Sequence, residues 1–239
     1  MTKNKIKTIL EQEFVHGYTT FDRLFMASML LLQIVVFIIV PDSWLSIVCG
    51  ISGVISTVLC AKGKISFYFI GFIQTITYLI LAWQNWLVGE CIEQIFYLVT
   101  MIWGIFLWKK NLKVDENNAA YVEVKKFSLL MWIVSVFCTI VGTLLTGYCL
   151  TLVNSNQPYL DASTNVIAVF AQFMMIKGYR EQWMWWMVLN CIMIVIWGRV
   201  GNWTMVAMYI AWLLNCGYAW YNWTQLHRTQ ATQSIPENS

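Results

Sequence analysis

The sequence predicts an all-α polytopic membrane protein with eight transmembrane helices in the order 1+3+1+3. In this fold, two parallel three-helix repeats are joined by a linking helix. Composition is the first observation that predicts it: hydrophobic residues fill 59% of the 239 positions and charged residues only 11%, against roughly 25% charged in a soluble domain. The second is that the apolar segments are separated by very short connections. The third is that a pattern of three such segments occurs twice.

Eight apolar stretches approach the length of about 20 residues that a helix needs to cross a bilayer. An N-terminal arm, residues 1–23, precedes them and has the apolar spacing of an amphipathic helix that could lie on the membrane surface. An additional transmembrane helix is expected next, within 24–43. The expected spans are 24–40, 44–61, 65–83, 87–108, 127–150, 159–176, 181–198 and 203–223.

The two repeats are expected at 44–108 and 159–223. A unit of three helices ends on the opposite side of the membrane from its start, so a second copy keeps the same orientation only if the chain crosses once more. Residues 109–158 supply a cytoplasmic loop and this linking helix. Lys62-Gly63-Lys64 in the first copy corresponds to Lys177-Gly178-Tyr179 in the second. Parallel repeats around a site at the membrane midplane are one way to build a transporter.

The third helices of the two copies also correspond. Trp103-Gly104 and Trp108 in the first copy match Cys216-Gly217 and Trp220 in the second. The matched positions are separated by 112 to 115 residues (220 minus 108, and 177 minus 62), a nearly constant offset, as expected for an internal repeat.

The basic residues predict the orientation in the membrane. With the N-terminus in the cytoplasm, the inner segments carry all of the 15 Lys and Arg residues except Arg199. Short loops with this bias usually face the cytoplasm. Both termini are therefore expected inside, and residues 224–239 form a cytoplasmic tail. Polar connections are expected at 115–118 and in the last residues of the tail.

Polar side chains within the expected spans are candidate site residues, because an amide or ionisable group in hydrocarbon is costly unless it faces other helices or a wet cavity. Trp183, Trp186 and Asn190 lie three and four residues apart and share one helix face. Two indoles with nearby amides could bind a flat, polar or cationic ring, since Trp faces attract cations by roughly 0.5–2 kcal/mol. The other candidates are Gln172, Gln74, Tyr78, Glu93, Gln94, Tyr97, Asn165 and Asn215.

These residues also have structural interpretations. Trp183 lies near the cytoplasmic end of its helix and could belong to the interfacial tryptophan belt. Asn190, Gln172 and Asn215 could form hydrogen bonds that hold neighbouring helices together. The sequence contains no phosphate-binding GxxxxGK[ST] loop and no basic face for nucleic acid. No cofactor motif and no cluster with metal-ligand spacing is present, so neither a cofactor nor a metal is expected.

The run Tyr179-Arg180-Glu181-Gln182-Trp183, continued by Trp186 and Asn190, resembles the signature of the PnuC family of vitamin-precursor transporters. Two more segments, Pro158-Tyr159-Leu160-Asp161-Ala162 and Lys62-Gly63-Lys64-Ile65-Ser66, strengthen the resemblance, which covers roughly residues 44–223. It implies repeats similar to those of SWEET transporters, a homotrimer, and a place in the cytoplasmic (inner) membrane of a bacterium. The implied activity is facilitated diffusion of nicotinamide riboside, which is trapped by intracellular phosphorylation.

The resemblance also implies roles for single residues. Trp183, Trp186 and Asn190 would bind the nicotinamide end of the substrate, and Gln172 and Gln74 would complete the cavity. Relatives often read Asn-Tyr-Phe-Phe-Gly-x-x-Asn in the first copy, whereas this chain has Phe67 and Gln74 at the asparagine positions. The first span, 24–40, is not shared by all relatives.

The leading hypothesis is a passive transporter that works by alternating access. The alternatives are a transporter of another vitamin such as thiamine, and a membrane receptor that binds a small molecule without an open pathway. An integral membrane enzyme would need a convergent acid, base or nucleophile. The polar set inside the spans consists of amides and indoles instead, so no enzyme is expected.

Overall fold

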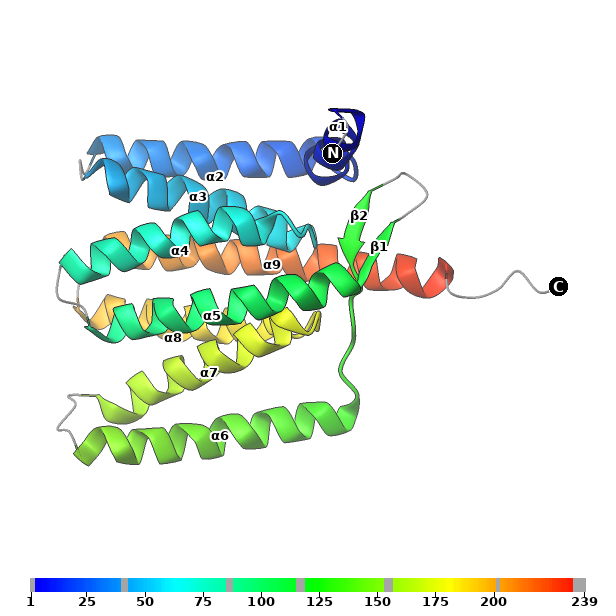
Figure 1. The fold of residues 1–239 in the computed structure, drawn as a ribbon. Coiled ribbons are helices and arrows are strands. Elements are labelled where there is room, and N and C mark those ends of the chain that lie inside the picture. Colours follow the sequence, from blue (N-terminus) through cyan, green and yellow to red (C-terminus); the bar gives the residue numbers. More distant parts are fainter. Residues whose placement is uncertain are drawn as a thin grey trace. The chain divides into compact units, whose positions relative to one another are not determined.

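The computed structural model of the protein describes residues 3–39, 43–84, 88–114, 119–152, 157–200 and 203–233. The chain divides into two compact units, Met1–Glu123 and Val124–Ser239, and the described residues are almost entirely helical (Figure 1). Among them, six helices are long and apolar enough to cross a membrane, and a shorter apolar stretch covers Gln182–Ile196. The protein is thus an all-helical membrane protein, while the total of eight crossings in the order 1+3+1+3 stays a prediction.

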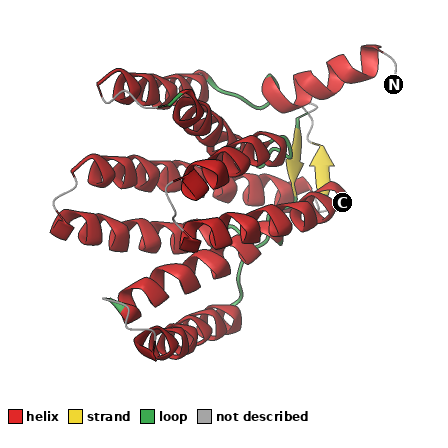
Figure 2. Ribbon diagram, turned by 60° about the vertical axis from the view of Figure 1, so that its left-hand side comes forward, coloured by secondary structure: helices red, strands yellow, loops and turns green. Residues whose placement is uncertain are grey.

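Unit 1 consists of packed helices followed by a short antiparallel hairpin, which Figure 2 shows in yellow. Helix α3 packs against α2 and α4, and α4 packs against α5. The hairpin was not predicted, because its strands are only three residues long, too short for an alternating pattern to stand out. The elements are α1 (Lys3–Phe14), α2 (Thr20–Ile39), α3 (Trp44–Ala61), α4 (Phe67–Gln84), α5 (Val88–Lys110), β1 (Leu112–Val114) and β2 (Ala120–Val122).

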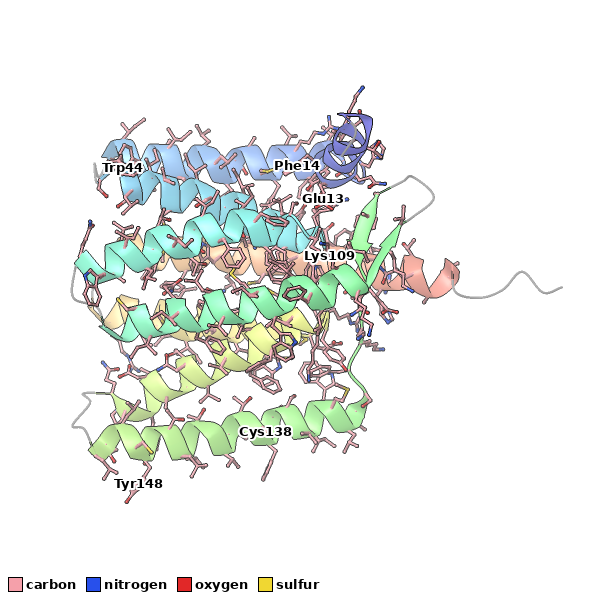
Figure 3. The ribbon with its side chains drawn as sticks, viewed as in Figure 1. Glu13, Phe14, Trp44, Lys109, Cys138 and Tyr148 are labelled. Carbon is pink, nitrogen blue, oxygen red and sulfur yellow. The ribbon has the colours of Figure 1, made fainter. Side chains whose placement is uncertain are left out.

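Unit 2 consists of α6 (Leu129–Leu152), α7 (Pro158–Ile176), α8 (Gln182–Val200) and α9 (Trp203–Gln233), each packed against the next. Most side chains of α6 are exposed, including Cys138 and Tyr148 (Figure 3), as expected for a helix that faces lipid. Helix α9 continues well past the expected end of the span at 223. Its last turns are held in place, since Gln230 Oε1 accepts a hydrogen bond of 2.9 Å from the backbone N–H of Val124. Of the expected polar segments 115–118 and 232–239, residues 232 and 233 belong to α9, and the others lie outside the described residues.

The same glycine turn follows α3 in unit 1 and α7 in unit 2. Gly63 and Gly178 both have positive φ, 67° and 76°, a conformation that glycine adopts without a steric penalty at the end of a helix. Their N–H groups donate to Cys60 O at 2.9 Å and Met175 O at 3.0 Å, respectively. Both donors and both acceptors are separated by 115 positions (178 minus 63, and 175 minus 60).

An aromatic pair recurs at the same offset. Tyr68 contacts Trp108 edge to face at 5.3 Å between ring centroids, and Trp183 contacts Trp223 in the same manner at 5.9 Å. Both partner tryptophans, Trp108 and Trp223, are fully buried. This contact aligns Trp108 with Trp223, three positions beyond the Trp220 that sequence matching selects. The offset of 115 therefore holds from the turn to the C-terminal half of the third helix (183 minus 68, and 223 minus 108).

A buried ion pair ties the start of α2 to the turn after α3. Lys62 Nζ lies 2.8 Å from Asp22 Oδ2, and the two side chains are only 10% and 4% exposed. The same carboxylate oxygen accepts a hydrogen bond of 2.7 Å from the N–H of Thr19, and Thr19 Oγ1 accepts from the N–H of Asp22 at 3.2 Å. This reciprocal pattern is a capping box at the N-terminus of α2. Asp22 thus stabilises the first turn of α2 and also balances the charge of Lys62.

Lys64 and Ser66, which follow Lys62 in the turn after α3, bind the C-terminal end of α1. Lys64 is completely buried, and its ammonium group donates to the carbonyl oxygens of Gln12 at 2.7 Å and Ala120 at 3.1 Å. The N–H of Ser66 donates to the carboxylate of Glu13 at 2.9 Å (Glu13 is labelled in Figure 3). The arm is thus helical over Lys3–Phe14 and fixed at its end by protein contacts. Its placement on a membrane surface stays a prediction.

Replacing Lys62 by Met should destabilise the protein by about 3 kcal/mol, because the Asp22 carboxylate then stays buried without its cation. Chemical denaturation in detergent, followed by circular dichroism, measures the change. Lys113→Met is the matched control, since the pair of Lys113 with Glu123 is 3.9 Å long and solvent-exposed. That substitution should change stability by less than about 1 kcal/mol. Equal losses in the two variants would contradict the role of the buried pair.

Candidate functional site

Helix α8 carries the three residues that the sequence singled out. It begins at Gln182, just after the Gly178 turn, so Trp183 lies in its first turn. Trp183 is buried against Trp223 of α9. Trp186, one turn further along, is half-buried and packs against the apolar core of unit 2. The core residues that it joins come from α7, α8 and the segment before α6: Phe127, Ile167, Ala171, Met174 and Trp185.

Asn190 is a buried polar side chain in the middle of this helix. It is 3% exposed, and its Nδ2 donates to the Trp186 carbonyl at 2.9 Å and to Cys216 Sγ at 3.5 Å. Its Oδ1 is buried and has no hydrogen-bond partner among the described residues. Asn215, which precedes Cys216 on α9, is also buried with an unpaired Oδ1. An unpaired buried acceptor costs about 1–3 kcal/mol, so both oxygens are ready to accept a hydrogen bond from a ligand or water.

A second group of buried polar atoms lies at the start of α8, and sequence reasoning did not include it in the site. Arg180 Nε donates to Glu181 Oε1 at 3.0 Å. In the described part of the chain, the other carboxylate oxygen of Glu181 and both amide atoms of Gln182 lack partners, as do Trp183 Nε1 and Thr224 Oγ1. Gln182 is completely buried. The signal in the sequence was the charged and amide-bearing run that precedes Trp183.

The charges near this end of α8 act on one titratable group of α9. Burial lowers the pKa of His227, and the positive charges of Arg180 and Lys126 lower it further, while Glu181 partly opposes them. The neutral form of His227 is therefore favoured at pH 7 more strongly than in a free imidazole.

Helix α7 places its two candidates differently. Gln172 is buried, at 4% exposure, whereas Asn165 is exposed. The two residues lie seven positions apart and so were expected on one face. That shared face of α7 is therefore buried at the position of Gln172 and exposed at the position of Asn165. A role in binding stays a prediction for both.

On α4, Gln74 and Tyr78 are half-buried. The hydroxyl of Thr75 lies 3.4 Å from Gln74 Oε1 and donates to Met101 Sδ of α5 at 3.7 Å. The contact between Thr75 and Met101 corresponds to the contact between Asn190 and Cys216 in unit 2. Thr75 precedes Asn190 by 115 positions (190 minus 75), and Met101 precedes Cys216 by the same number (216 minus 101).

On α5, two of the three candidates contact each other. The hydroxyl of Tyr97 donates to Glu93 Oε1 at 2.7 Å, as spacing of four residues on a helix allows. Gln94 is buried, at 6% exposure. The carboxylate of Glu93 is thus partly neutralised by hydrogen bonding within its own helix.

Known proteins resemble this chain over most of its length. The family model described as nicotinamide mononucleotide transporter matches residues 43–225. The nicotinamide riboside transporter PnuC of Haemophilus influenzae is 38% identical over 218 residues, covering 91% of this chain and 95% of that protein. The nicotinamide riboside transporter PnuC of Neisseria mucosa is 32% identical over 231 residues, covering 93% of this chain and 88% of the relative.

A solved structure is also similar. The crystal structure of the vitamin B3 transporter PnuC superimposes with a TM-score of 0.80 at 30% sequence identity. The match covers 96% of this chain and 99% of the solved one. Both the sequence and the helical fold are therefore shared with transporters.

Proposed function

This chain belongs to the nicotinamide mononucleotide transporter family together with its PnuC relatives, and we propose that it carries nicotinamide riboside across the cytoplasmic membrane by facilitated diffusion. The observation that supports the proposal is the α8 face on which the spacing of Trp183, Trp186 and Asn190 places them, together with the buried and unpaired oxygen of Asn190. The family and the relatives are transporters, so the hypothesis of a membrane enzyme is set aside.

The chemistry of this face fits the proposed substrate. Nicotinamide riboside contains a flat pyridinium ring, which the π-face of a tryptophan attracts. Its carboxamide N–H can donate to Asn190 Oδ1, and its ribose hydroxyls can bond to amide groups, which both donate and accept. The other sequence-predicted candidates stay proposed substrate contacts within their own units: Gln74, Tyr78, Glu93, Gln94 and Tyr97 in unit 1, and Gln172, Asn165 and Asn215 in unit 2.

We further propose that eight helices, α2 to α9, cross the membrane in the order 1+3+1+3, with α6 as the linking helix and both termini in the cytoplasm. The turns, aromatic pairs and sulfur contacts that recur at an offset of 115 positions support two parallel repeats. Transport by alternating access would need no phosphate-binding motif. Phosphorylation of the substrate in the cell would make uptake one-way, and the protein would assemble as a homotrimer.

Uptake of labelled nicotinamide riboside into proteoliposomes tests the proposed function. The label should enter until its concentration is equal on both sides, without ATP and without an ion gradient. Liposomes without protein give the background. Tight binding without flux would contradict a transporter and favour a receptor. A gradient requirement would contradict facilitated diffusion.

Replacing Trp183 or Trp186 by Ala should weaken binding of nicotinamide riboside by about 1–3 kcal/mol, the scale of a buried aromatic contact with a cationic ring. Isothermal titration calorimetry of the purified protein measures the affinity. Trp44→Ala is the control, since Trp44 is 74% exposed at the start of α3 (Figure 3). Affinity that is unchanged in both site variants would refute the stacking role of the indoles.

Asn190→Leu should leave the protein folded but poorly selective, because leucine fills a similar volume and offers no hydrogen-bond acceptor. The readout is competition of thiamine with labelled nicotinamide riboside for uptake. Asn222→Leu is the matched control. Asn222 also donates to the carbonyl four residues before it, that of Tyr218, at 3.0 Å. Full uptake and full discrimination by Asn190→Leu would show that Asn190 only holds helices together.

A further inference from the structure

We propose that Cys216 is a positioning residue that fixes the side-chain amide of Asn190, so that the site accepts a pyridine carboxamide and rejects the corresponding pyridine carboxylate. The proposal rests on the proposed function, since it specifies how the same site distinguishes between two closely related nucleosides. It concerns only contacts within unit 2.

The orientation of the Asn190 amide follows from what its neighbours can accept. The Trp186 carbonyl oxygen can only accept a hydrogen bond, so the group 2.9 Å from it must be the Nδ2 of Asn190. The second N–H of the same nitrogen faces Cys216 Sγ at 3.5 Å across the packed α8–α9 interface. Both donors of the amide are then used by protein groups, and only Oδ1 is left for a ligand.

The equivalent contact in unit 1 supports the role of the sulfur as an acceptor. Thr75 and Met101 occupy the positions 115 residues before Asn190 and Cys216. The Thr75 hydroxyl has two acceptors within reach, Met101 Sδ at 3.7 Å and Gln74 Oε1 at 3.4 Å. A thioether sulfur has no hydrogen and can only accept. The repeat thus places an accepting sulfur on its third helix opposite a polar side chain on its second helix. In unit 2 that side chain is an amide.

The site therefore offers hydrogen-bond acceptors to a ligand from two asparagine side chains. Asn190 Oδ1 is buried and unpaired among the described residues, and Asn215 Oδ1 is a second such oxygen on the residue before Cys216. A carboxamide offers N–H donors to these oxygens. A carboxylate offers only acceptors and carries a negative charge, so it would meet unpaired oxygens in a buried site. The amide of Asn190 could serve a carboxylate only by rotating, and that rotation would break both contacts of its nitrogen, with the Trp186 carbonyl and with Cys216 Sγ.

The experiment compares nicotinamide riboside with nicotinic acid riboside, its carboxylate analogue, by calorimetric titration of the purified full-length protein. The wild type should prefer the carboxamide. Cys216→Ala should reduce the ratio of the two affinities by about three- to tenfold, the factor that one neutral hydrogen bond supplies. Cys216→Ser should restore the ratio, because a hydroxyl also accepts. Cys191→Ala, at the exposed neighbour of Asn190, should keep the wild-type ratio.

Two results would overturn the proposal. One is an unchanged affinity ratio in Cys216→Ala. The other is the same loss in Cys216→Ala and Cys216→Ser, which indicates that the thiol only fills space. A wild type that binds neither nucleoside refutes the proposed function and the assigned specificity together.

The sulfur contact itself is measured without substrate. The infrared S–H stretching band of Cys216, identified by its loss in Cys216→Ala, should shift in Asn190→Leu, because the sulfur no longer accepts from the amide. An unshifted band refutes the contact whatever the proteins bind, so failure of the inference and failure of the proposed function are distinguished.

Discussion

A polar group buried among apolar helices must have a hydrogen-bond partner, and this constraint determines where this protein can bind a ligand. At the Asn190 side chain the constraint is only half satisfied. Both N–H groups are used by the Trp186 carbonyl and the Cys216 sulfur, while the oxygen is buried and unpaired within the described chain. The same constraint is fully satisfied at Lys62, where the Asp22 carboxylate lies at 2.8 Å. The ion pair stabilises the scaffold, whereas the unpaired amide oxygen of Asn190 is available to a ligand.

The two units share a scaffold and differ in their polar chemistry. The glycine turn, the edge-to-face aromatic pair and the contact with sulfur occur in both at one offset. Where unit 1 has Thr75, with a hydroxyl that donates to Met101, unit 2 has Asn190 with an acceptor left over. Where unit 1 has the apolar ring of Phe67, unit 2 has the buried amide of Gln182. The recurring contacts provide rigid positions, and the substitutions at those positions supply the recognition chemistry of α8.

Much of this could be predicted from the sequence. Apolar length located the helices, the paired glycine turns exposed the repeat, and the spacing of Trp183 and Asn190 placed them on one face. The hairpin after α5 and the extension of α9 escaped prediction because short strands and polar helical turns carry little periodicity. Helix-face arguments cannot state which neighbour covers a face, so Gln172 and Asn165 could not be separated. The role of Cys216 depends on a contact between two helices, and nothing in the spacing of cysteines indicates it.

The most direct test of this account is a structure of the protein with nicotinamide riboside bound. In that structure the pyridinium ring should lie against the indoles of Trp183 and Trp186, with the carboxamide nitrogen within hydrogen-bond distance of Asn190 Oδ1. The amide nitrogen of Asn190 should keep its contact with Cys216. A ligand that binds away from α8, or a site in which the Asn190 oxygen remains without a partner, would contradict it.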